Sequence, residues 1–65
     1  MKLTTETRPH PMHPDTHVIV IVYRRGRALA CTWALPAPSP EQIKQAWRDD
    51  PAAFEPYDET TGHYL

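Results

Sequence analysis

The longest apolar stretch of this 65-residue chain runs from His17 to Leu35 and is interrupted once, by a turn signal. Val18 to Tyr23 is a run of β-branched and aromatic residues, which favour strands. Arg24-Arg25-Gly26-Arg27 follows it, and Ala28 to Leu35 then alternates large and small side chains. Two strand-forming segments around a short turn that contains glycine predict a β-hairpin.

The predicted hairpin is apolar on both faces. If Arg25-Gly26 is a two-residue turn, Val22 pairs with Leu29, and the following pairs are fixed in turn. Because successive strand residues point to opposite faces, the first face contains Val18, Val20, Val22, Leu29, Cys31 and Trp33. The second face contains Ile19, Ile21 and Tyr23 opposite Thr32, Ala30 and Ala28. A bulged three-residue turn, the alternative, shifts the pairing by one residue and regroups both faces.

A helix is predicted to begin after Ser39. Ser39-Pro40-Glu41-Gln42 combines an N-cap residue, a proline at the first helical position and a glutamine that completes a capping box. One helical face then has Ile43, Ala46 and Trp47, and the side turned toward water has Lys44, Gln45 and Arg48.

Asp50-Pro51 predicts the end of this helix, because the residue before a proline is disfavoured in the helical region. Asp50 is expected to cap a second short turn, Pro51 to Phe54, which brings Phe54 near Trp47.

These segments predict a small α+β fold, an antiparallel hairpin packed against one short amphipathic helix. Residues 1–16 are expected to be a flexible arm rich in proline and histidine, residues 17–56 the hairpin–helix core, and residues 57–65 an acidic tail. A third strand could come from either end of the chain, either from Lys2 to Thr7 or from Thr60 to Leu65.

Two ligand-like patterns lie in the predicted arm. Arg8, Pro11 and Pro14 match R-x-x-P-x-x-P, which resembles the motif that SH3 domains bind, although a proline-rich segment meets this pattern easily by chance. The imidazole rings of His10, His13 and His17 could together bind a metal ion. Prolines between them stiffen the chain against wrapping a metal, so we expect a solvated arm with no metal and no cofactor.

The charges are unevenly distributed. Arg24, Arg25 and Arg27 crowd the hairpin tip, whereas the segment from Asp49 onward is acidic and has no Lys or Arg. A formal net charge of -1 argues against general binding of polyanions. The sequence shows no aromatic stacking platform beside the arginines, which favours a solvated turn over a nucleic-acid contact.

Cys31 is the only cysteine, and we expect it to behave as a small core hydrophobe in a reducing compartment. The opening residues MKLTTET have no apolar region typical of a secretory signal, and no apolar run reaches the roughly 20 residues that span a bilayer. These observations predict a cytoplasmic protein that does not associate with membranes.

The sequence contains none of the common catalytic motifs, so we expect no enzymatic activity. It predicts a small protein-binding module, an adaptor or inhibitor, that acts through a sheet edge or an exposed apolar sheet face. The partner would be another protein or a second copy, a homodimer formed through the hairpin, with nucleic acid disfavoured. Predicted contact residues are Ile19, Ile21, Tyr23, Arg24, Arg25 and Arg27.

Two alternatives stay open at this point. The first is a small nucleic-acid-associated regulator that uses the arginine tip. The second concerns the apolar face with Ile19 and Ile21, which the arm or the tail of the same chain could cover in place of a partner.

Overall fold

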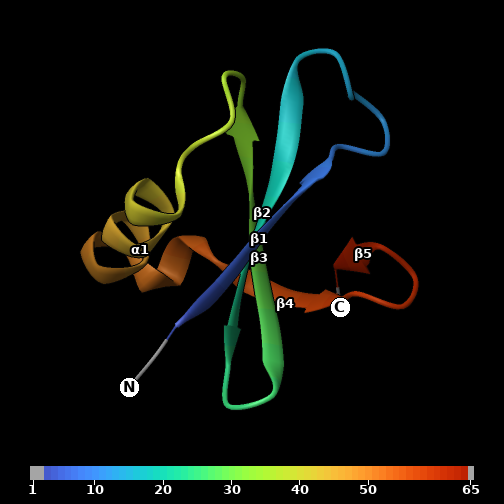
Figure 1. Cartoon of the computed structure of the whole chain (residues 1–65). Helices are drawn as coiled ribbons and strands as arrows, with labels where there is room; N and C mark the ends of the chain where they lie inside the picture. Colours follow the sequence, from blue (N-terminus) through green and yellow to red (C-terminus); the bar gives the residue numbers. More distant parts are fainter. Residues whose placement is uncertain (1–2, 65) are drawn as a thin grey trace.

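A computed structural model describes residues 3–64, which form a five-stranded antiparallel sheet and one α-helix (Figure 1). The sheet order, β1-β2-β3-β4-β5, follows the chain order. The elements are β1 (Thr4–Pro9), β2 (His17–Arg24), β3 (Arg27–Ala34), α1 (Pro40–Asp49), the 3-10 turn η1 (Pro51–Ala53), β4 (Glu55–Asp58) and β5 (His63–Tyr64). The predicted α+β class is confirmed, and both ends of the chain contribute strands to the sheet.

The β2–β3 hairpin has the predicted register. Arg25 and Gly26 form the turn with φ values of 52° and 77°, and two positive φ values match the twist of the flanking strands. Val22 lies opposite Leu29 and Val18 lies opposite Trp33, as a two-residue turn requires. The bulged alternative is therefore excluded.

Helix α1 begins with the predicted capping box. The Ser39 hydroxyl accepts a hydrogen bond from the Gln42 backbone N–H (3.2 Å), and the Gln42 side-chain oxygen accepts one from the Ser39 N–H (2.8 Å). The helix ends before Asp50-Pro51, as expected. The predicted cap by Asp50 was wrong, because its side chain makes no capping hydrogen bond to η1. Backbone N–H groups of Ala53 and Phe54 close that turn instead.

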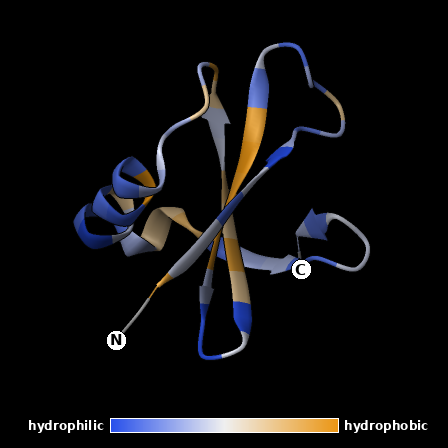
Figure 2. Cartoon of the chain, viewed as in Figure 1, coloured by the Kyte–Doolittle hydropathy of each residue, from blue (hydrophilic) through white to orange (hydrophobic). Residues whose placement is uncertain are grey.

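The first apolar face of the hairpin is covered by the helix. Val18, Val20 and Val22 are buried against Ile43 and Phe54, and half-buried side chains, Trp47 and Trp33 among them, surround this cluster. The rings of Trp47 and Phe54 meet edge to face with centroids 5.3 Å apart, which confirms their predicted proximity. Figure 2 shows the apolar residues concentrated along the central strands and the inner side of α1.

The second apolar face is covered by the C-terminal part of the same chain. Tyr57 of β4, which is 6% exposed, packs with Ile19, Ile21 and Ala30. β4 pairs with Leu29 and Ala30 of β3, and the short β5 then returns beside β4. Figure 1 shows α1 and β5 on opposite sides of the central strands. Cover from within the chain, one of the open alternatives, is what the structure contains.

β1 forms one edge of the sheet and occupies part of the segment for which the sequence predicts an arm. Its six residues pair with β2 from Thr4 opposite Tyr23 to Pro9 opposite Val18. On its other side, β1 has no strand neighbour among residues 3–64. The edge of the sheet at β1 is therefore open.

Candidate interaction site

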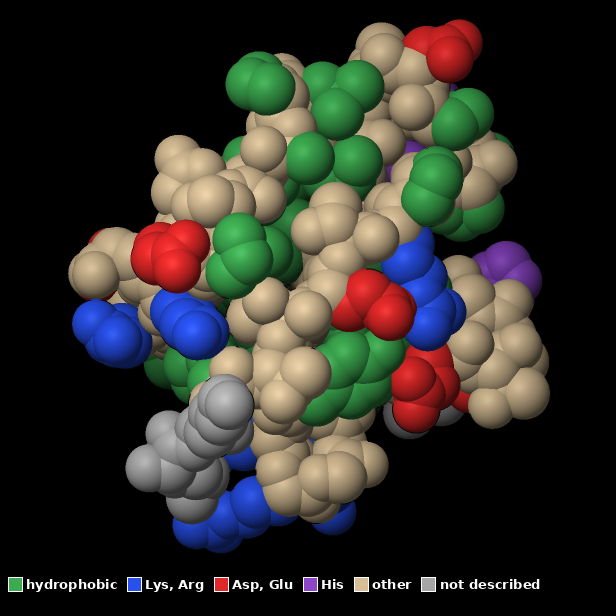
Figure 3. Space-filling view, in the orientation of Figure 1, with side chains coloured by type: hydrophobic (Ala, Val, Ile, Leu, Met, Phe, Trp, Pro, Cys, Tyr) green, Lys and Arg blue, Asp and Glu red, His purple; other side chains and the backbone are tan. Residues whose placement is uncertain are grey.

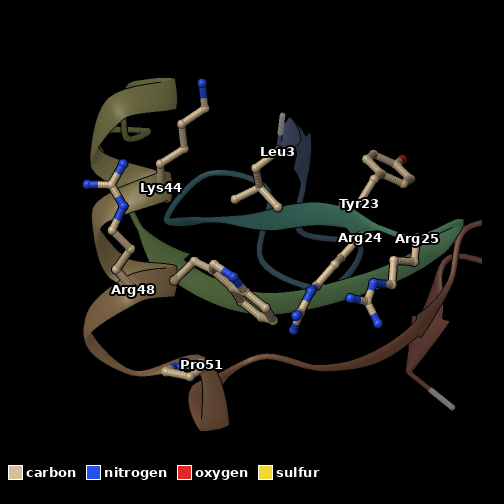
Figure 4. Close-up of a pocket in the computed structure, with 8 residues that line it drawn as sticks. Leu3, Tyr23, Arg24, Arg25, Lys44, Arg48 and Pro51 are labelled. Carbon is tan, nitrogen blue, oxygen red and sulfur yellow. The ribbon is translucent and has the colours of Figure 1, made fainter. Parts of the chain in front are cut away.

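A groove lies between the tip of the β2–β3 hairpin and helix α1 (Figure 4). Its volume is about 890 Å³. The hairpin contributes Arg24 and Arg25, and the helix contributes Lys44 and Arg48, one helical turn apart. The remaining lining residues are Leu3, Tyr23, Trp47 and Pro51. We call this surface, defined by these eight residues, the cationic groove.

The cationic groove has four positive side chains and no acidic residue in its lining. The structure has one ion pair within residues 3–64, between Arg8 and Glu6, and it involves none of the groove cations. In the space-filling view, Lys and Arg side chains cover the hairpin tip and one side of α1 (Figure 3). Guanidinium groups are planar forks that match carboxylate and phosphate oxygens, so this surface is suited to an anionic ligand.

The predicted contact residues are divided between the core and this groove. Ile19 and Ile21 are 3% and 0% exposed, so the chain itself occupies the face that was expected to attract a partner. Arg24 and Arg25 line the cationic groove, whereas Arg27 lies outside it. Arg27 borders a smaller hollow that Arg24, Arg25 and Leu29 also line.

Tyr23 connects three segments of the chain. Its hydroxyl donates to carboxylate oxygens of Glu6 in β1 (3.2 Å) and of Glu59 in the β4–β5 turn (3.1 Å). Burial first, and then the hydrogen bond to Glu59, raise the pKa of Tyr23 to about 12. Arg8 also reaches this turn, donating to the backbone oxygen of Glu59 (3.3 Å). These contacts hold the C-terminal turn against β1 and β2.

The open edge of β1 presents backbone groups at every second residue. The His10 N–H donates to the His17 carbonyl oxygen (3.3 Å), so the even-numbered residues of this segment are the ones whose backbone groups face β2. In an antiparallel pair, bonded and non-bonded positions alternate, so the backbone groups of Thr5 and Thr7 point away from β2. Pro9 also lies at one of these outward positions, where its lack of an N–H costs no hydrogen bond to β2.

The three histidines of the β1–β2 connection lie together. Their ring centroids are 5.3 Å apart for His10 and His13, and 6.2 Å apart for His17 and each of the others. The Nδ1 atom of His10 accepts backbone N–H bonds from Met12 and His13, both at 3.1 Å. These two hydrogen bonds occupy the Nδ1 atom of His10 within the chain. No group of three potential ligands within residues 3–64 has the geometry of a metal site.

The other singled-out motifs also occupy structural positions. Arg8 of the R-x-x-P-x-x-P pattern belongs to β1, Pro11 lies in a bend and Pro14 in a turn, so the pattern is not one continuous polyproline helix. Cys31 is half-buried beside the helix-side core, and burial raises the pKa of its thiol. The R-x-x-P-x-x-P segment is therefore not arranged as an SH3 ligand, and the half-buried Cys31 thiol is not in the exposed setting of a reactive cysteine.

Sequence reasoning missed the helix side of the groove. Lys44 and Arg48 were expected to face water, and no aromatic stacking platform was expected beside the arginines, whereas Trp47 lines the same groove as Arg24 and Arg25. One signal was available in the sequence. At 100° per residue, Trp47 lies between buried Ile43 and the two cations, so one side of this ring borders a basic surface.

Comparisons with protein-family models, with curated proteins and with solved structures found no match for this chain. Within residues 3–64, no helix has the length and apolar character needed to cross a membrane. The fold and its surfaces define the class, a small α+β protein whose edge strand β1 has no strand neighbour on its outer side within residues 3–64, with a basic groove beside it.

Proposed function

We propose that this protein is a small non-enzymatic binding module, an adaptor or inhibitor, that captures an extended segment of another protein as an added strand on β1. The observation that carries this proposal is the open edge of β1, where the backbone groups of Thr5 and Thr7 point outward. Strand addition satisfies such groups with main-chain hydrogen bonds, and the side chains of the added strand supply specificity.

The edge is a better candidate than an apolar sheet face. Ile19 and Ile21 are already buried under Tyr57. Among residues 3–64, the large apolar side chains that remain exposed, Met12, Leu35 and Tyr64, come from separate segments. The edge strand also contains Glu6, Arg8 and Pro9, which oppose indiscriminate pairing with other strands. A short, charged edge is suited to a selected partner.

A second copy of the chain is a less favoured partner. β2 has a strand on each side, so a homodimer through the hairpin would have to use the half of β3 beyond Leu29 and Ala30, which β4 leaves unpaired. The lone, half-buried Cys31 is compatible with a reducing compartment, and we propose that the module acts in the cytoplasm.

The test is a variant that removes one outward N–H. Thr7→Pro deletes the outward donor without deleting a β1–β2 hydrogen bond, and Thr7→Val keeps the N–H as its matched control. The probe is a synthetic peptide of alternating Thr and Val, and its binding is measured by fluorescence anisotropy. Binding by the wild type and by Thr7→Val, weakened about tenfold in Thr7→Pro, is the expected result for a lost main-chain hydrogen bond of about 1 kcal/mol or more. Equal binding by all three proteins would refute strand addition at β1.

A nucleic-acid-associated regulator is the second candidate, because Trp47 lies among the four cations of the groove. Aromatic stacking beside basic side chains is how many proteins hold single strands. If this candidate is right, a single-stranded oligonucleotide binds at about 0.15 M salt and its affinity falls steeply as salt rises. We expect no measurable complex at that salt concentration, since the protein as a whole is slightly acidic.

A further inference from the structure

The cationic groove and the open edge are neighbours in the fold. Leu3 lines the groove and directly precedes Thr4, the first residue of β1. Thr4 in turn lies opposite Tyr23, which also lines the groove. The groove therefore adjoins the N-terminal end of β1, the end at which an added strand would leave or enter.

The charge of the groove specifies the chemistry of its ligand. Four cations come from two elements, Arg24 and Arg25 from the hairpin tip and Lys44 and Arg48 from α1, and none has an ion-pair partner among residues 3–64 (Figure 4). Two acidic side chains of the C-terminal segment are already engaged within the chain: Glu59 accepts a hydrogen bond from the hydroxyl of Tyr23 at the border of the groove (3.1 Å), and Asp58 accepts one from the Thr60 N–H (2.9 Å). An external anion is the ligand that complements this surface.

The apolar part of the lining indicates a peptide. Leu3, Trp47 and Pro51 border the groove beside the four cations, so the groove offers contacts for an apolar side chain as well as for carboxylates. A nucleic-acid strand longer than the groove would also meet the acidic residues of a protein whose net charge is -1. An acidic peptide with one apolar residue suits a mixed lining of this kind.

Strand direction places the acidic residues within the partner. An added strand antiparallel to β1 runs from the Pro9 end toward the Thr4 end, as neighbouring strands of this sheet do. Its residues beyond Thr4 would arrive at the groove, each extending the chain by about 3.3 Å. The acidic residues would then follow the strand in the partner sequence.

We propose that the cationic groove binds an acidic segment, with one apolar residue, that directly follows the partner strand added to β1. This inference rests on the proposed function, because the groove would act as an extension of the edge site. It names the partner class as a protein segment with a short β-forming stretch followed by carboxylates.

The experiment compares three synthetic peptides of matched length. The first has a five-residue Thr/Val strand followed by Asp-Glu-Leu-Asp, the second has the acidic part before the strand, and the third has the Thr/Val strand with a neutral flank. The protein variants are wild type, the double variant Arg24→Gln with Arg48→Gln, and Arg27→Gln. Arg27 belongs to the same hairpin tip but does not line the groove, which makes it the matched control.

The expected result is that the first peptide binds wild type about tenfold more tightly than the other two. That advantage should disappear in the double variant, persist in Arg27→Gln and shrink as salt is raised. Circular dichroism checks that each variant is folded. We expect that it is, because Arg24 and Arg48 are exposed.

The contrary outcomes separate the two proposals. Equal binding of the first and third peptides, or an advantage that survives in the double variant, overturns the groove inference and leaves strand addition in place. Tighter binding of the second peptide overturns the proposed direction. A groove-dependent complex with a single-stranded oligonucleotide at about 0.15 M salt assigns the groove to nucleic acid instead. If none of the three peptides binds, the proposed function itself is refuted.

Discussion

Replacing Tyr57 with alanine tests whether the C-terminal segment closes the core. Tyr57 is 6% exposed and packs with Ile19, Ile21 and Ala30, so its truncation leaves a cavity on the second sheet face. Truncating a buried aromatic side chain to alanine costs about 3–5 kcal/mol. A chain of this size has roughly 3–10 kcal/mol of total stability, at about 0.05–0.15 kcal/mol per residue. We therefore expect Tm to fall by at least about 12 °C.

Thermal melts followed by tryptophan fluorescence measure this effect cleanly. Trp33 and Trp47 belong to the helix-side core, so the substitution on the opposite face does not remove a neighbour of either probe. Tyr57→Phe keeps the ring and is the matched control, expected within about 1 kcal/mol of wild type. If Tyr57→Ala unfolds before heating, Tyr57→Leu gives a milder truncation. A Tyr57→Ala protein as stable as wild type would mean that the tail does not cover this face, and a partner at Ile19 and Ile21 would again be needed.

Two further predictions concern titration and metals. The folded-state pKa of Tyr23, raised to about 12, lies above the ordinary value of 10.0, so its stabilising contribution is present below pH 10 and is lost as pH rises toward 12. Urea unfolding of wild type should therefore lose more stability over this interval than that of Tyr23→Phe, and parallel curves would contradict the effect. For the histidine cluster we expect no stoichiometric submicromolar Zn²⁺ binding by calorimetry, because Nδ1 of His10 is already an acceptor. Tight binding that disappears in His13→Ala would contradict this.

The sequence predicts the centre of the fold well because local signals agree there. The Arg25-Gly26 turn sets the hairpin register, and the register decides which side chains share each face. Ser39 and Gln42 set the start of the helix through a capping box that needs only neighbouring residues. Each of these features depends on short-range geometry, which a sequence pattern encodes directly.

The outer strands were harder to predict because long-range contacts stabilise them. β1 has the sequence TTETRP, which is not apolar enough to indicate a core strand, and it forms beside β2 with its odd-numbered residues on the helix side. β4 includes Pro56 and is held largely by burial of Tyr57. Neither segment has a strong local preference, so the energy that orders them comes from faces of the hairpin that lie far away in sequence.

The candidate site was only partly predictable for the same reason. The arginine tip is visible in the sequence, but its neighbours on α1 are about twenty residues away, and only the fold brings them beside it. The choice of Ile19 and Ile21 as contact residues depended on their being left uncovered, which was one of two open alternatives.

The two apolar faces and the open edge together limit how this protein can bind. α1 covers one face and Tyr57 the other, so most of the apolar surface of the hairpin is used to fold the chain. Among residues 3–64, the polar groups left without a partner include the outward backbone groups of Thr5 and Thr7 at the edge, and the groove cations beside Leu3. Recognition through main-chain hydrogen bonds and charge tolerates many side chains in the added strand, so selectivity would have to come from the acidic flank. If strand addition at β1 is correct, we expect the groove to discriminate between partners and the edge to supply most of the affinity.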